Sequence, residues 1–283
     1  MKAYAHVQKI TALHVILFFL TLLSTIVAGM FQKGISPIKS PERFYEGLPF
    51  ALTLLTILLA HELGHYISSV KHNTHATLPY FIPAPSIFGT FGAFIKMKSP
   101  IQTRTALLDI GASGPVIGFI FSVAASIIGL MGSKIVEISG NQGLILGDSI
   151  LFTFMSKLIL GTPPAGHDIM LNSVAFAGWI GLFITSLNLL PVGQLDGGHI
   201  AYAVTDIGHK WSSRVVVVVL FCMGILYWEG WLMWAFLMVV LKLHHPPVYF
   251  SDIPLDPSRK KVAFLSLLIF IVTFMPTPFI IND

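Results

Sequence analysis

The chain is poor in charge and nearly free of cysteine. Only 11% of its 283 residues are Asp, Glu, Lys or Arg, whereas 54% are hydrophobic, and the mean hydropathy is +0.79. Since about a quarter of the residues in a soluble domain are charged, this composition indicates an integral membrane protein surrounded by a lipid bilayer. The single cysteine, Cys222, excludes an intrachain disulfide and a cysteine-based zinc finger.

The chain also lacks blocks of like charge. Its net charge is +4, and the basic residues are scattered over the polar segments between apolar runs. This pattern suits anionic lipid headgroups and argues against a nucleic-acid partner. The first apolar run is too long for a signal peptide and has no small-residue cleavage site, so we interpret it as a retained helix.

Long apolar runs are present instead. A transmembrane helix needs about 20 apolar residues, and the runs predict about six spans in an all-α polytopic membrane protein, with residues 1–283 as a single domain. The predicted spans are 10–30, 48–70, 106–131, 173–190 continuing in broken form to 205, 214–243 and 262–276. The apolar piece at 150–160 is too short to cross and is predicted to be re-entrant or interfacial.

The second predicted span carries three ionisable residues within five positions: His61, Glu62 and His65. Histidines at i and i+4 share one face of a helix, so both imidazoles can reach one metal ion. The adjacent glutamate can then act on water at that ion, as in the His-Glu-x-x-His pattern of zinc metallohydrolases. Ionisable residues inside a membrane span are costly and mark functional sites.

A second polar cluster interrupts the fourth predicted span at residues 188–199. Pro191 and the neighbouring glycines break the helix, and a broken span at membrane depth indicates a cavity or a site. Catalytic zinc takes three protein ligands. The predicted third ligand is Asp196, the only acid of this cluster. The alternatives are His199, Asp168 and Glu137.

Residues 78–100 are not a normal span. They contain four prolines and a glycine-rich, alternating run, which predicts a membrane-embedded strand or β-hairpin. Its free edge could pair with an extended peptide, although an ordinary interfacial loop explains the residues equally well. We interpret His72 and His75, which precede it, as solvated loop residues. The small residues at 109–118 are explained by close helix packing.

With both polar clusters in view, the chain resembles the site-2 proteases, a family of intramembrane zinc metalloproteases. The match rests on His61-Glu62-Leu63-Gly64-His65 and on Asn188-x-x-Pro191-x-x-x-Leu195-Asp196-Gly197-Gly198. It covers roughly Leu48 to Thr205. The connection at 132–171 is too short for the PDZ domain of many bacterial members, and the resemblance leans toward the branch related to plastid metalloproteases.

The resemblance implies a function and a site. One Zn²⁺ would be held by His61, His65 and Asp196, with Glu62 as general acid and base and Asn188 helping to hold substrate or to stabilise charge on the scissile carbonyl. The implied substrate is a transmembrane protein or peptide, which would pair with the hairpin. The implied hairpin contacts are Gly89, Phe91, Gly92 and Ala93.

The implied location is a bacterial inner membrane, with the site toward the cytosol. Charge does not decide this orientation, because the basic residues divide almost evenly between the two sides of the six-span topology. Two other functions use the same residues differently. A divalent-metal transporter would pass the ion between such ligands, and a membrane scaffold would use none of them for catalysis.

Overall fold

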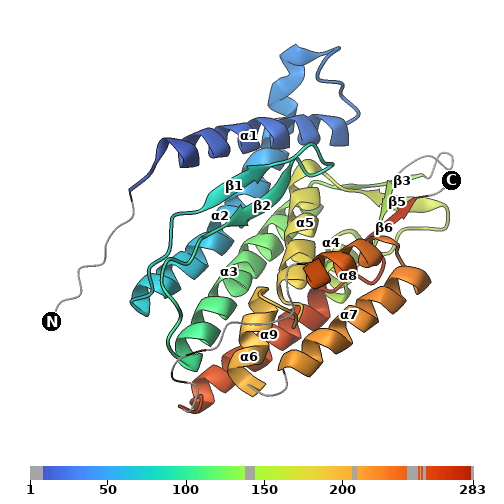
Figure 1. The fold of residues 1–283 in the computed structure, drawn as a ribbon. Coiled ribbons are helices and arrows are strands. Elements are labelled where there is room, and N and C mark those ends of the chain that lie inside the picture. The colour runs from blue at the N-terminus through green and yellow to red at the C-terminus, as the bar shows by residue number, and fades with distance from the viewer. Residues whose placement is uncertain are drawn as a thin grey trace.

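The computed structural model describes residues 9–137, 144–205, 209–240, 248, 250 and 253–281. The described chain is predominantly helical, with a few short strands (Figure 1). The helices are α1 (Ala12–Gln32), the 3₁₀ helix η1 (Pro41–Gly47), α2 (Leu48–Lys71), α3 (Arg104–Met131), α4 (Ile150–Leu160), α5 (Ser173–Asn188), α6 (Asp196–Thr205), α7 (His209–Leu226), α8 (Gly230–Val240) and α9 (Pro257–Thr273). The strands are β1 (Tyr80–Pro83), β2 (Thr90–Phe94), β3 (Lys134–Glu137), β4 (Leu144–Leu146), β5 (His167–Met170) and β6 (Phe279–Ile281).

Three of the described helical segments are long and apolar enough to cross a membrane: Ala12–Gln32, Pro41–Lys71 and Arg104–Met131. The remaining apolar helices are shorter. At the centre, α3 packs against both α2 and α5, while α1 passes across one end of this group (Figure 1). Large side chains such as Phe50, Leu54 and Trp179 are fully buried between these helices.

The fourth predicted span is broken where the sequence indicates. Helix α5 ends at Asn188, and α6 begins at Asp196 after a turn that contains Pro191. Proline has no backbone N–H to continue the helix. The turn is also tight, because a Cβ on Gly197 would lie 2.0 Å from the Leu189 carbonyl oxygen. The break therefore puts Asp196 at the start of a new helix.

The prediction of one continuous fifth span at 214–243 is wrong. Helix α7 ends at Leu226, α8 begins at Gly230, and Gly224 lies against Leu232, so the chain folds back on itself (Figure 1). The intervening segment contains a charged residue and leads into glycine, a poor helix former. Residues 241–243 lie outside the described chain. Because α7 and α8 fold back on each other, the chain does not cross to the opposite end of the bundle, and α9 begins at the end where α3 begins. A continuous fifth span would have placed the start of α9 at the opposite end.

Strands β1 and β2 lie within the 78–100 region and pair antiparallel, with Phe81 opposite Ala93 and Ile82 opposite Gly92. Strand β1 packs on α1. The turn between the strands is also fixed to α1, because the Ser24 hydroxyl donates to the Gly89 carbonyl at 2.6 Å. Two further antiparallel pairs, β3 with β5 and β4 with β6, lie at the other end of α3 (Figure 1).

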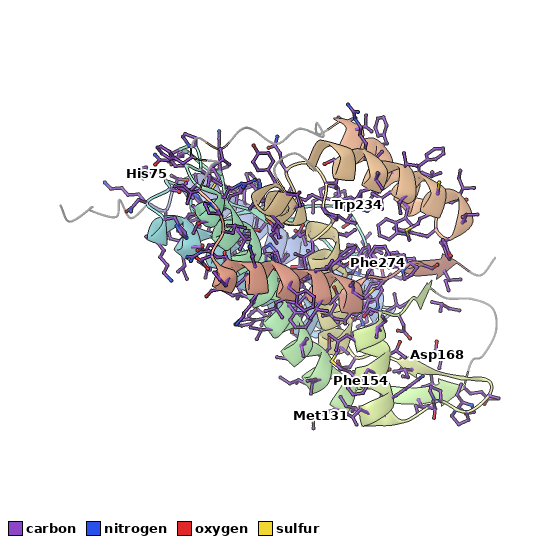
Figure 2. All side chains as sticks on the ribbon, turned by 90° about the horizontal axis from the view of Figure 1, so that it is seen from below. His75, Met131, Phe154, Asp168, Trp234 and Phe274 are labelled. Atoms are coloured by element: carbon purple, nitrogen blue, oxygen red, sulfur yellow. The ribbon has the colours of Figure 1, made fainter. Side chains whose placement is uncertain are left out.

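The interpretation of His72 as a solvated loop residue is wrong. His72 caps the C-terminal end of α2, and its Nε2 lies 2.8 Å from an Asp109 carboxylate oxygen. Its side chain is only 19% exposed. His75, which follows it, lies on the side of the molecule away from Met131, Phe154 and Asp168 (Figure 2).

Candidate metal centre

Two histidines of α2 and the first residue of α6 converge in the interior. The Nε2 atoms of His61 and His65 lie 3.0 Å apart, and each lies 3.3 Å from Oδ2 of Asp196. The histidines are 5% and 6% exposed, and the Asp196 side chain is 16% exposed. The i, i+4 spacing places His61 and His65 on the same face of α2, and the break after α5 places Asp196 at the start of α6, next to them.

These distances fit a single metal ion. Ligand atoms about 2.0–2.1 Å from a tetrahedral ion are about 3.4 Å from one another, close to the observed 3.0 and 3.3 Å. Two imidazoles and one carboxylate also leave a fourth position open, which is the arrangement of catalytic zinc sites. Among the described residues, these three form the one group able to hold an ion in this way.

The alternative third ligands do not join the group. Asp168 and Glu137 lie on the paired strands β5 and β3, with Glu137 opposite His167. His199 lies one turn beyond Asp196 on α6, where its Cβ packs beside Gly111 of α3. The ligand roles of His61, His65 and Asp196 remain predictions, although the geometry brings together these residues and none of the alternatives.

The orientation of His65 is set by α3. Its Nδ1 lies 2.7 Å from the Ile110 carbonyl oxygen, in a buried contact. Because a carbonyl only accepts hydrogen bonds, Nδ1 carries the proton and donates it. The lone pair of the ring is therefore on Nε2, the atom that faces His61 and Asp196.

Glycines of α3 form the wall beside the two histidines. A Cβ on Gly114 would lie 2.1 Å from Nε2 of His65, and one on Gly118 would lie 2.9 Å from Nδ1 of His61. Across the interface, a Cβ on Gly64 would lie 2.7 Å from the Ser113 carbonyl oxygen. The interpretation of these small residues as packing alone is therefore incomplete, because they also make room for the imidazoles.

The two predicted catalytic residues lie next to this group. Glu62 is 7% exposed and follows His61 on α2. Asn188 is the last residue of α5, and its Nδ2 lies 3.4 Å from Nε2 of His61. Both side chains are thus within reach of a molecule bound at the histidines.

The four predicted hairpin contacts differ in accessibility. Phe91 is 74% exposed, whereas Gly92 and Ala93 are partly exposed. Gly89 is buried, and a Cβ there would lie 2.4 Å from the Ser24 carbonyl oxygen, so it packs on α1 and is not available to a substrate. In the described chain β2 pairs only with β1, which leaves its other edge without a strand partner.

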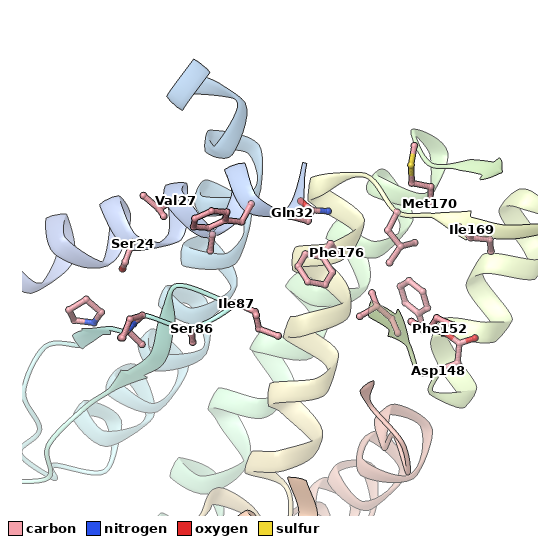
Figure 3. A pocket seen from close by; sticks show the side chains of 18 of the residues that line it. Ser24, Val27, Gln32, Ser86, Ile87, Asp148, Phe152, Ile169, Met170 and Phe176 are labelled. Atoms are coloured by element: carbon pink, nitrogen blue, oxygen red, sulfur yellow. The ribbon is translucent and has the colours of Figure 1, made fainter. Parts of the chain in front are cut away.

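A groove of about 1290 Å³ lies apart from the metal centre (Figure 3). Its walls come from α1, the turn between β1 and β2, and the segments around α4 and β5, and they are mostly apolar. Asp148 and Asp168 are among the lining residues, but His61, His65 and Asp196 are not. Burial raises the pKa of Asp148, and this effect outweighs a hydrogen bond with Thr153 that lowers it; the nearby charge of Asp168 also raises it.

Comparison with known proteins gives a consistent result. A family model described as Peptidase family M50 matches residues 49–228. "Probable zinc metalloprotease EGY2, chloroplastic" of Arabidopsis thaliana is 30% identical over 248 residues, which are 84% of this chain and 43% of the relative. The protein of the same name from Oryza sativa subsp. indica is 28% identical over 268 residues, 92% of this chain and 48% of the relative.

A third relative, "Probable zinc metalloprotease EGY1, chloroplastic" of Arabidopsis thaliana, is 28% identical over 235 residues, 81% of this chain and 43% of the relative. The chain therefore spans less than half the length of these relatives. The matched region includes both polar clusters recognised in the sequence. No solved structure matches the chain significantly.

Proposed function

This chain belongs to peptidase family M50, the site-2 protease family, and we propose that it is an intramembrane zinc metalloprotease. It would hydrolyse peptide bonds within or beside the transmembrane segments of other membrane proteins, as a step of regulated intramembrane proteolysis. The convergence of His61, His65 and Asp196 beside Glu62, on buried helices of an apolar protein, carries the proposal.

Each residue of the cluster has a role in the proposed hydrolysis. His61, His65 and Asp196 would hold one zinc ion, which would supply Lewis acidity to the scissile carbonyl and lower the pKa of water. Glu62 accepts a proton as water attacks the carbonyl carbon, and it returns a proton to the leaving amine as the C–N bond breaks. Such proton transfer contributes about 10²- to 10⁴-fold to the rate. Asn188 donates a hydrogen bond to the developing oxyanion.

The substrate must be extended to be cut, because a helix keeps its carbonyl groups in internal hydrogen bonds. We propose that the free edge of β2 receives the unwound segment as an added strand, which satisfies its exposed backbone groups. Phe91, Gly92 and Ala93 would contact it, whereas Gly89 would not. Strand β2 contacts α2, the helix that carries His61, Glu62 and His65, and this supports delivery of the added strand to the metal centre.

We further propose a single domain over residues 1–283 with six membrane-embedded helical segments. These are α1, α2, α3, the broken α5–α6 unit, the folded-back α7–α8 pair counted as one segment, and α9. The β1–β2 pair would lie at membrane depth between α1 and the metal centre. Burial in the protein would make a strand tolerable there.

The distribution of basic residues supports an orientation with the metal centre toward the positive side, which is the cytosol in a cell membrane. The end of the bundle where α9 meets α3 carries more basic side chains than the other end. Described basic residues at this end are Lys71, Lys96, Lys98, Arg104, Arg214, Arg259, Lys260 and Lys261, against Lys9, Lys33, Lys39, Arg43, Lys134 and Lys157 elsewhere. The basic residues counted from the sequence did not favour either side, because a continuous fifth span assigns Arg259, Lys260 and Lys261 to the opposite end of the bundle.

The expected location in a bacterial inner membrane has no support among the relatives, which are plant proteins with "chloroplastic" in their names. We therefore propose only a membrane location with a bilayer and a transmembrane substrate as partners. The transporter and scaffold alternatives are not retained, because neither function uses a buried glutamate beside the first histidine.

The test is cleavage of single-pass membrane proteins by the full chain in liposomes, with bound zinc counted in every sample. We expect cleavage and about one zinc per wild-type chain. Glu62→Gln, which has the same shape, should retain the zinc and lose at least about 100-fold in rate. A folded wild-type protein that binds no zinc would overturn the proposal, and so would a Glu62→Gln protein that cleaves as fast as wild type.

A further inference from the structure

The carboxylate of Asp109 lies where three helices meet. Its Oδ2 atom lies 2.8 Å from Nε2 of His72, at the end of α2. It also accepts two hydrogen bonds from the Arg259 guanidinium of α9, at 2.8 and 3.2 Å. The Asp109, His72 and Arg259 side chains are 22%, 19% and 31% exposed, so this is a partly buried network and not a surface ion pair.

The next residue of α3 is Ile110, whose carbonyl fixes the His65 ring at 2.7 Å. Helix α3 therefore contacts α2 through two successive residues, the side chain of one and the backbone of the other. The contacted histidines, His65 and His72, lie seven residues apart, which is two helical turns on the same face of α2. The two contacts together fix the position of α3 along the axis of α2 and its rotation relative to α2.

We propose that Asp109 is a positioning residue for the metal centre, acting through Ile110 on His65. Held by His72 and Arg259, Asp109 keeps the Ile110 carbonyl where it can accept the Nδ1 proton of His65. That hydrogen bond keeps the lone pair of Nε2 directed at the metal position. The proposal rests on the zinc-protease function proposed above, and it assigns to the start of α9 a part in maintaining the site.

The experiment measures zinc affinity by chelator competition on the full chain in detergent. Asp109→Asn keeps the shape of the side chain but removes the charge that holds Arg259 and His72. Mutation of a residue that orients a metal ligand typically lowers metal affinity by about 10- to 100-fold. We expect the zinc affinity of Asp109→Asn to fall within that range. Arg259→Met should weaken zinc binding in the same direction, and Arg259→Lys should retain most of the affinity.

The matched control is Asp256→Asn. Asp256 is the other carboxylate partner of Arg259, and its hydrogen bonds are to Arg259 in the first turn of α9, which it caps. Its removal should leave zinc affinity within about twofold of wild type. A cobalt-substituted sample adds a second readout, because a turned His65 changes the ligand-field absorption spectrum of bound Co²⁺, whereas loss of stability alone does not.

Weaker zinc binding and a changed cobalt spectrum in Asp109→Asn, but not in Asp256→Asn, would support the inference. Unchanged affinity in Asp109→Asn would overturn it while leaving the proposed function intact. Equal losses in both variants, in step with their melting temperatures, would also overturn it by reducing Asp109 to a structural role. A folded wild type without zinc would overturn both proposals together.

Discussion

The metal centre and the groove beside α1 both place carboxylates among apolar helices, but they are built differently. At the metal centre, one carboxylate oxygen lies 3.3 Å from each of two imidazole nitrogens that are themselves 3.0 Å apart. In the groove, Asp148 and Asp168 are two of many lining residues around a space of about 1290 Å³. The groove is thus not the place where potential metal ligands converge.

The difference comes from how closely the supporting helices approach. Glycines of α2 and α3 allow the backbones to meet beside His61 and His65, so the donors are held by rigid, buried elements. The groove is lined by α1 together with short strands and turns, and turns fix side chains less tightly than packed helices do. Convergence of donors on rigid helices, and not volume, therefore identifies the site of chemistry in this molecule.

Replacing one carboxylate from each region gives the largest expected contrast. Asp196→Ala removes a proposed ligand, and we expect zinc affinity to fall by more than about 100-fold. Mutation of residues that only hydrogen-bond to a ligand already lowers metal affinity by about 10- to 100-fold. Asp168→Ala, the matched change in the groove, should leave zinc affinity within about twofold of wild type. Chelator competition measures both. Comparable losses in the two variants would contradict the distinction between the regions.

A smaller effect is expected from the glycine wall. In Gly114→Ala the new methyl group would lie 2.1 Å from Nε2 of His65, so the ring must turn away and zinc affinity should fall at least about tenfold. Gly118→Ala should do less, because its Cβ would lie 2.9 Å from Nδ1 of His61.

The control for both variants is Gly129→Ala on the same helix. Its Cβ would lie 2.0 Å from the Ala175 backbone nitrogen, far from the donors. It should lower the melting temperature without weakening zinc binding to the folded protein. If all three variants lost zinc equally, the glycines would matter for helix packing only.

The sequence predicted those parts of the site that depend on local spacing. His61, Glu62 and His65 sit on one helix, where a spacing of four residues fixes which side chains share a face. The break at Pro191 was also predictable, because proline acts on its own helix. The predominantly helical fold followed from the length of the apolar runs, and the predicted bounds of α2 and α3 agree with the structure to within a few residues.

Features that depend on tertiary packing were not predictable from the sequence. Asp196 was one of four possible third ligands, because nothing local to α6 shows that it faces α2. Gly114 and Gly118 resembled packing residues, since their neighbours across the interface are more than forty residues away in sequence. The turn between α7 and α8 was hidden in a run whose apolar length alone favoured one helix.

The smallest expected effect concerns stability at the groove. The pKa of Asp148 is raised by burial, so its ionised form disfavours the folded state. The stability it contributes is present below its unfolded pKa and is lost as the pH rises through its folded pKa. Asp148→Asn should therefore raise the melting temperature by about 1–2 °C at pH 7, less at pH 4, and should not change zinc affinity.

Asp256 provides a control of opposite sign. Hydrogen bonds from the Arg259 backbone and side chain lower the pKa of Asp256, so its carboxylate favours the folded state above its unfolded pKa. Asp256→Asn should lower the melting temperature at pH 7 and have a smaller effect as the pH falls through the folded pKa. Thermal unfolding of both variants at two pH values checks these signs. A destabilised Asp148→Asn protein at pH 7 would show that the favourable interactions of this carboxylate with Thr153 and Lys157 outweigh the cost of burying its charge.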